Sequence, residues 1–262
     1  MLASADLCKG LREVFEALLK EEDPEILTKL VPLLSDLTAI FQEIKTNESD
    51  SPSKELKESK EKEAKDYGFS QASETKSYLE DVLGIGNALS KYHNWRLEIK
   101  FLEGFPIYYE IFDMKELNEK LASYLINQVK EGVNEVRQKA IEMLVKFMRT
   151  NYLSLKFKEL MKVFIEEFCN SNCYQMRIAF INLFLKFGEI FSRTFIKQNL
   201  LNQIFLLKAD KTVQVRRKLA SHLAEIRGVL LPDDTENIKK FAELVKRLAQ
   251  DLDKEVSGVI VL

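Results

Sequence analysis

The sequence predicts an all-α fold, a solenoid of about six stacked helical hairpins. Apolar residues recur with a period near 3.6 along most of the chain, and no segment alternates strictly between apolar and polar side chains. Glycine and proline are few, with 9 and 5 in 262 residues, which favours long helices over folds with many tight turns. A hydrophobe followed by arginine also returns about every 40 residues, the period of two-helix repeats.

The hydrophobe–arginine pair sets the register of the repeats. Its second position recurs at intervals of 41, 40, 39 and 41 residues, at Arg96, Arg137, Arg177, Arg216 and Ser257. The apolar residues that precede it are Trp95, Val136, Met176, Val215 and Val256. Near the N-terminus, the segment EEDPEIL places Ile26 before Leu27 in the same slot. The pair therefore marks one structural position in successive hairpins.

One segment interrupts the repeats. Between positions 47 and 66 the apolar side chains are Leu56 and Ala64, besides one proline, and most other residues are Glu, Lys, Asp or Ser. Such a stretch cannot bury a face, so we expect a disordered charged insert over 47–75.

The length of this insert supports the repeat register. The marker positions Leu27 and Arg96 are 69 residues apart. One repeat of about 40 residues leaves about 29, which is the length of the insert. The expected organisation is a first repeat over 1–46, the insert over 47–75, and continuous repeats over 76–262 with the last one truncated.

Apolar stripes at helical spacing place the helices. In the third and fourth hairpins the stripes are Leu117, Leu121, Leu125, Val129; Val136, Ala140, Ile141, Leu144, Val145, Met148; Leu160, Met161, Phe164, Phe168; and Met176, Phe180, Leu183, Phe184, Phe187, Phe191. The expected first helices span 4–20, 76–91, 114–130, 153–169, 193–208 and 236–250. The expected second helices span 25–45, 94–112, 134–150, 173–191, 212–230 and 253–262. The second helices carry two apolar stripes, as helices packed between neighbours require.

The marker arginines stand in the first turn of each second helix, directly after the hairpin turn. An arginine there is disfavoured by the helix dipole, so we expect each to bind an acidic residue of an adjacent turn. Suitable acids recur: Glu131, Asp210 and Asp251 lie six residues before a marker, and Asp23 and Asp253 lie four before. We therefore expect a structural ladder of bridges, formed by Arg96, Arg137, Arg177 and Arg216. The preceding hydrophobe should face the partner helix.

Composition excludes several classes of protein. With 46% apolar residues the chain can bury a large core, and a net charge of −2 gives no support for sequence-independent nucleic-acid binding. The three cysteines, Cys8, Cys169 and Cys173, form no disulfide framework, which favours a reducing compartment. No signal peptide and no membrane-spanning run is recognised. We expect a soluble, cytoplasmic protein.

Candidate catalytic chemistry is sparse. The histidines, His93 and His222, have no Cys or acid at metal-site or triad spacing, and we expect His222 to be an ordinary helical residue. In CNSNC, Cys169 and Cys173 flank a hairpin turn without further ligands, and we expect both to be buried. We therefore expect no enzyme activity, no metal, no cofactor and no small-molecule substrate.

The repeat pattern resembles HEAT repeats, whose hallmark is an acid in the intra-repeat turn followed by Val-Arg. The segment YHNWRLEIKFLEGFP (92–106), with Asn-Trp-Arg opening a second helix, and the run FGEIFSRTFIKQNLLNQIFLLKADKTVQVRRKL resemble the HEAT-repeat scaffold and regulatory subunits of the protein phosphatase 2A and 4 group. This resemblance implies a non-catalytic, cytoplasmic subunit that binds the phosphatase catalytic subunit. The charged insert is atypical of these proteins.

In such phosphatase scaffolds, the aligned intra-repeat turns grip partners. The resemblance therefore implies a partner-binding surface here, and the candidate residues are His93, Asn94, Trp95, Asn134, Asp210 and Lys211. Two alternatives stay open at these positions: solvated turns without a partner, and a Trp95 that fills the slot of the other repeat hydrophobes. The alternative function is a generic HEAT-repeat adaptor for transport or the cytoskeleton, unrelated to a phosphatase.

Overall fold

The computed structural model describes residues 10, 13–20, 23–49, 78–152 and 154–260, and these residues form helices and turns with no strand. The predicted all-α solenoid of helical hairpins is confirmed. The chain divides into two compact units, Met1–Leu121 and Ala122–Leu262, which are described separately as unit 1 and unit 2. Among the described residues, no helix is both long and apolar enough to cross a bilayer.

Unit 1 holds the first two hairpins and the start of the third. Residues 13–18 are helical, and the elements that follow are α2 (Pro24–Leu30), η1 (Val31–Leu33), α3 (Leu34–Ser49), α5 (Tyr78–Lys91), α6 (Trp95–Glu103), α7 (Phe105–Ile111), α8 (Met114–Glu116) and the π-helical turn η3 (Leu117–Leu121). Helix α3 packs against α7, and α5 packs against α6. Aromatic rings of α6 and α7 pack together in the core of this unit, where Phe105 contacts Phe101 and Tyr108.

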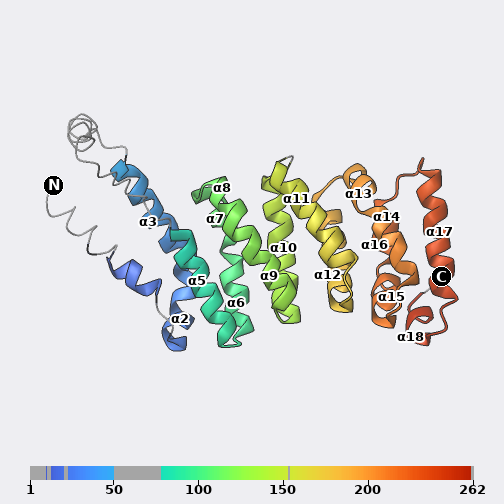
Figure 1. The fold of residues 1–262 in the computed structure, drawn as a ribbon, viewed down its shortest axis with the longest axis horizontal. Coiled ribbons are helices and arrows are strands. Elements are labelled where there is room, and N and C mark those ends of the chain that lie inside the picture. The colour runs from blue at the N-terminus through green and yellow to red at the C-terminus, as the bar shows by residue number, and fades with distance from the viewer. Residues whose placement is uncertain (1–9, 11–12, 21–22, 50–77, 153, 261–262) are drawn as a thin grey trace. The chain divides into compact units, whose positions relative to one another are not determined.

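Unit 2 continues the same arrangement to the end of the chain. Its elements are α9 (Ala122–Glu131), α10 (Asn134–Thr150), α11 (Leu155–Val163), the π-helical turn η4 (Phe164–Cys169), α12 (Tyr174–Ile190), α13 (Arg193–Asn199), α14 (Leu201–Leu206), η5 (Leu207–Ala209), α15 (Val213–Ala220), α16 (Leu223–Val229), α17 (Thr235–Ala249) and α18 (Lys254–Ser257). Within this unit, successive hairpins lie side by side in chain order (Figure 1).

The second helices of unit 2 pack against one another in series. Helix α12 packs against α10 on one side and α15 on the other, and α15 packs against α18. Two neighbours require two apolar faces, and α12 accordingly buries Phe180, Ile181, Phe184 and Phe187. Because each second helix follows its own hairpin turn, these contacts bring successive turns to the same edge of the unit.

The expected helix bounds agree with the structure best where a second helix is unbroken. Helix α10 spans the expected 134–150, whereas the second helices expected over 94–112 and 212–230 are each broken in two. The first break is at Gly104, after which α7 begins at Phe105 with Pro106 in its first turn. A Cβ on the glycine would lie 3.0 Å from Cβ of Ser35. Apolar residues on both sides of each break remain buried. The apolar periodicity of the sequence therefore does not reveal where these helices are broken.

Two further expectations concern the N-terminal half. Residues 47–49 continue α3, and the remainder of the expected insert, 50–75, lies outside the described residues. In the first hairpin the expected slot hydrophobe Ile26 is 41% exposed, while Leu27 is fully buried. The prediction that Ile26 faces the partner helix is therefore wrong, and the apolar slot of this hairpin is one residue later. Val136, Val215 and Val256 are fully buried as expected.

Candidate functional site: the intra-repeat turns

The last three intra-repeat turns of unit 2 share one backbone feature. Six residues before the marker positions 177, 216 and 257, a side-chain oxygen accepts a hydrogen bond from the backbone N–H two residues later. Asp210 Oδ1 accepts from Thr212 at 2.8 Å, and Asp251 Oδ1 accepts from Asp253 at 3.0 Å. In the preceding hairpin, Ser171 Oγ accepts from Cys173 at 3.2 Å. A short polar side chain at this slot therefore shapes the turn.

Arg177 joins two of these turns. Its Nε donates to Asp210 Oδ2 at 2.6 Å and its Nη2 donates to Asp210 Oδ1 at 2.9 Å, which is a bidentate bridge to the next hairpin. Its Nη1 donates to the backbone carbonyl of Ser171, in its own turn, at 2.7 Å. The side chains of Arg177 and Asp210 are only 7% and 5% exposed. The guanidinium therefore locks one turn to the next from a buried position.

Arg216 repeats this geometry one hairpin later. Its Nε and Nη2 donate to the carboxylate of Asp251 at 2.6 and 3.0 Å, and its Nη1 donates to the backbone carbonyl of Asp210 at 2.8 Å. Asp210 thus binds Arg177 through its side chain and Arg216 through its backbone. The turns that contain Ser171, Asp210 and Asp251 are linked in series by these two bridges.

The other two marker arginines depart from the expected ladder. Arg137 donates to the backbone carbonyls of Val129 at 2.8 Å and Lys130 at 3.4 Å, and the slot that an acid would fill in the next turn holds Ser171. In unit 1, the guanidinium carbon of Arg96 lies 4.4 Å from the ring centroid of Trp95. Neither arginine has an ion-pair partner among the described residues, so the acid expected for each of them is missing.

The bridges favour the ionised carboxylates. Burial opposes ionisation of Asp210, but the hydrogen bonds from Arg177 and from the Thr212 N–H outweigh it, so the pKa of Asp210 lies below its ordinary range. The hydrogen bonds from Arg216 outweigh burial at Asp251 and lower its pKa in the same way. Both carboxylates therefore stay charged over the whole physiological range.

The turns expose large apolar side chains to solvent. In unit 2 these are Val133, Tyr174 and Leu252, which are 51%, 41% and 101% exposed, and in unit 1 Tyr92 is 44% exposed. Each lies three to five residues before a marker position. They were not predicted from the sequence, because the repeat pattern pointed to the polar turn residues. The signal was present, since an apolar residue in a polar turn has no partner helix to pack against.

The predicted contact residues of unit 1 have definite local roles. His93 is exposed and has a left-handed backbone, with φ of 52°. Asn94 caps α6 by accepting a hydrogen bond from the N–H of Leu97 at 3.4 Å. Trp95 is half-buried beneath the guanidinium of Arg96. His93 is exposed and, unlike Asn94, does not cap a helix.

The predicted contact residues of unit 2 divide into two groups. Asn134 and Lys211 are exposed in or beside their turns. Asp210 is instead committed to Arg177, so its carboxylate is not open to a partner. Beside it, a hollow of about 310 Å³ is lined by Cys169, Leu206, Asp210 and Lys211 among others, and Leu206 is 71% exposed there.

We define the turn ridge of unit 2 as the exposed residues Val133, Asn134, Tyr174, Lys211 and Leu252. They belong to four successive turns, three of which are joined by the arginine–aspartate bridges. An apolar surface on such a constrained edge suits recognition of a protein partner, because little backbone freedom is lost on binding.

Reactive groups do not gather at these turns. Burial raises the pKa of the Cys169 thiol to about 11, so it is protonated at neutral pH. Cys173 is exposed, contrary to the expectation that it is buried. Among the described residues, no group of three His, Cys, Asp or Glu side chains is placed to hold a metal ion.

No protein-family model matches the chain. A mouse protein, serine/threonine-protein phosphatase 4 regulatory subunit 4, is 24% identical over 169 residues. The similarity covers 63% of this chain and 19% of the mouse protein, so the chain spans about a fifth of that relative's length. The likeness to this regulatory subunit is therefore distant and partial.

Proposed function

We propose that this chain is a non-catalytic regulatory or scaffold subunit that binds a serine/threonine phosphatase catalytic subunit of the phosphatase 4 or 2A type. The observation that carries the proposal is the similarity to the mouse regulatory subunit along 63% of the chain. The proposal includes a cytoplasmic location, as the HEAT-type resemblance implies. The contact surface in the proposal is the turn ridge of unit 2.

The physical properties of the ridge support this choice of surface. Tyr174 and Leu252 offer large apolar contact area, and Lys211 and Asn134 offer polar groups beside it. Tyrosine is enriched among residues that dominate binding energy in protein interfaces. Because Arg177 and Arg216 fix the backbone beneath these side chains, binding costs little ordering of the turns.

A direct binding measurement tests the function. The purified chain is immobilised and exposed to purified catalytic subunits of phosphatase 4 and phosphatase 2A, with an established regulatory subunit as the positive control. We expect saturable binding to at least one catalytic subunit. Binding to neither, while the positive control binds both, would overturn the proposal.

Affinity purification followed by mass spectrometry from cytosolic extract supplies a second readout. We expect a phosphatase catalytic subunit among the recovered proteins. Recovery of an unrelated partner that competes for the turn ridge, without any phosphatase, would instead favour the generic adaptor.

A further inference from the structure

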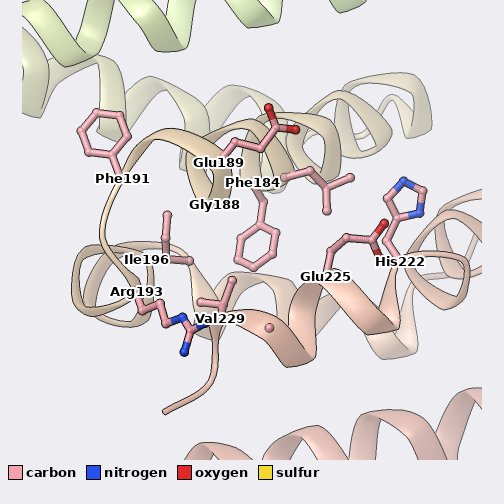
Figure 2. A pocket seen from close by; sticks show the side chains of 11 residues that line it. Phe184, Gly188, Glu189, Phe191, Arg193, Ile196, His222, Glu225 and Val229 are labelled. Carbon is pink, nitrogen blue, oxygen red and sulfur yellow. The ribbon is translucent and has the colours of Figure 1, made fainter.

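A second hollow in unit 2 is lined by none of the turn-ridge residues, and Figure 2 shows it from close by. It has a volume of about 460 Å³ and is lined by the C-terminal part of α12, the start of α13, and α16. Gly188, in its wall, follows Tyr174 by fourteen residues along α12, which is about 21 Å at 1.5 Å per residue. The hollow is therefore a separate surface at the other end of the hairpin.

Two glycines create this hollow. Gly188 on α12 and Gly228 on α16 are 40 residues apart, so they occupy nearly the same place in successive second helices. A Cβ on Gly228 would meet nothing within 4 Å, and a Cβ on Gly188 would be 3.8 Å from Cγ2 of Val229. Helix α16 contacts both α12 and α13, so the missing side chains leave a recess between packed helices.

The walls and the ends of the hollow differ in chemistry. Phe184, Ile196 and Val229 are buried side chains that form an apolar middle. Arg193 lies at one end, and Glu225 lies with His222 at the other (Figure 2). The recess is therefore apolar between a cationic end and an anionic end.

The two end charges remain available to a ligand. Arg193 and Glu225 are exposed, and neither has an ion-pair partner within the described part of the chain, although Glu225 acts electrostatically on Lys218 and His222. By contrast Glu189, also in the lining, is already paired with Lys186 at 2.7 Å. Burial and the nearby Lys218 lower the pKa of His222, which is therefore neutral at pH 7 and leaves Glu225 as the charge at that end.

We propose that this hollow binds a short segment of a partner protein in which a bulky apolar side chain stands between an acidic and a basic residue. The apolar side chain would occupy the recess over Gly228, the acid would bind Arg193, and the base would bind Glu225. The volume falls within the range of about 300–1,000 Å³ that ligand sites have. A nucleic acid or an anionic membrane would instead place like charge against Glu225 and Glu189, which argues against those partners.

This site goes beyond the proposed phosphatase subunit function and uses other residues. A chain that holds a catalytic subunit at the turn ridge would keep the recess free for a second protein. The two proposals can fail separately, because a change at Gly228 leaves every residue of the turn ridge in place.

Short fluorescein-labelled peptides test the proposal on the full chain by fluorescence polarisation. The set places Leu, Phe or Trp at the centre, with Asp before and Arg after it, the reverse order, or two like charges. We expect one of the two mixed-charge orders to bind at least about tenfold more tightly than the like-charge peptides. Equal binding of all charge patterns, or no binding of any peptide, would overturn the proposal.

Variants of the recess complete the experiment. Gly228→Leu fills open space and should weaken the preferred peptide by about tenfold or more, whereas Gly84→Leu, at another exposed helical glycine with nothing within 4 Å, should not change it. The exchange Arg193→Glu with Glu225→Arg should reverse the preferred charge order. If neither Gly228→Leu nor the charge exchange changes the affinity for the peptides, the peptides bind elsewhere and the proposal is wrong. Binding to the phosphatase catalytic subunit should be unchanged by Gly228→Leu.

Discussion

Arg177 shows how a single residue couples two repeats. Its guanidinium binds two carbonyls of its own turn, those of Ser171 and Asn172, and both carboxylate oxygens of Asp210 in the next hairpin. With every partner in place, the buried charge is satisfied. Once the carboxylate is removed, the same burial becomes a cost, because an unpaired cation is left out of water.

The Asp210→Ala variant measures that cost. We expect it to lower the free energy of unfolding of unit 2 by about 3 kcal/mol, the lower part of the range for breaking a buried ion pair. The matched control is Glu243→Ala, which removes the exposed partner of Lys208 and should change stability by less than about 1 kcal/mol. Urea unfolding of both variants makes the comparison, and equal effects would show that the buried bridge is no more important than a surface pair.

His93 offers a test of a different kind. Its left-handed backbone, at φ 52°, is a conformation that costs a non-glycine residue about 1–2 kcal/mol and costs glycine little. His93→Gly should therefore leave stability unchanged or raise it by up to about 1 kcal/mol, after allowance for the greater freedom of glycine in the unfolded chain.

His93→Ala serves as the control, because alanine keeps the unfavourable φ and lacks the ring. Thermal unfolding followed by circular dichroism compares the two variants. A loss of more than about 1 kcal/mol in both variants would mean that the imidazole stabilises the turn through contacts, and the backbone argument would be wrong.

At the scale of the element, the hairpin turn of the fourth repeat lacks the acid that the fifth and sixth have. Ser171 accepts the same turn hydrogen bond as Asp210 and Asp251, yet it offers no carboxylate to Arg137. Arg177 reaches an acid 33 residues later and Arg216 reaches one 35 residues later, and Ser171 is 34 residues after Arg137. The sequence spacing for a third bridge is therefore present.

Ser171→Asp should complete this third bridge. We expect a gain of about 1 kcal/mol in the free energy of unfolding of unit 2, since Arg137 is half-buried and already oriented by backbone carbonyls. Ser171→Asn is the control, because it keeps the turn hydrogen bond without the charge. Equal stability of the two variants by urea unfolding would show that Arg137 does not reach this slot.

The bridges also predict how unit 2 responds to acid. Both aspartates have a folded-state pKa below the ordinary value of 3.8, so the unfolded chain takes up their protons first as pH falls. Their stabilisation is thus fully present above about pH 5 and is lost as pH falls through 3.8 toward the lowered folded-state values. Asp251→Asn should be less stable than the wild type at pH 7, and the difference should shrink toward pH 3 in urea unfolding. A difference independent of pH would mean that Asp251 stabilises the turn without its charge.

Helix bounds were predictable where a helix is unbroken and its apolar residues follow one strict period. The spacing of Val136, Ala140, Leu144 and Met148 places α10 correctly, because burial against both neighbours imposes a strict period. The break between α15 and α16 at Ser221 and His222 was not predicted, because apolar residues on both sides remain buried and the period continues across it.

The candidate surfaces were predictable only in part. The sequence showed that an acidic residue recurs at the turn position of Asp210 and Asp251. It did not show whether such a residue is buried in an ion pair or exposed to a partner, and Asp210 is buried in an ion pair. The recess required knowing that Gly228 faces open space and that Gly188 lies opposite Val229. The separation of the two glycines by 40 residues was a signal, and it acquires meaning only when the helices are packed.

At the scale of the molecule, each repeat contacts chiefly its neighbours, so stability and surface are both built one hairpin at a time. Within unit 2, the bridges of Arg177 and Arg216 hold three successive turns together. The exposed side chains of these turns are therefore held in a fixed order along the edge of the unit. A ridge of this kind is one continuous contact surface assembled from separate repeats. Its function is therefore best tested by changing several turns together.

The most direct measurement is the affinity of the chain for a phosphatase catalytic subunit after the ridge is altered. The variant combines Val133→Asp, Tyr174→Asp and Leu252→Asp. The control is Leu155→Asp, at an exposed apolar position at the start of α11, outside the intra-repeat turns. We predict that biolayer interferometry shows a loss of at least about tenfold for the ridge variant and wild-type affinity for the control. Unchanged affinity of a folded ridge variant would contradict the assignment of partner binding to the turns.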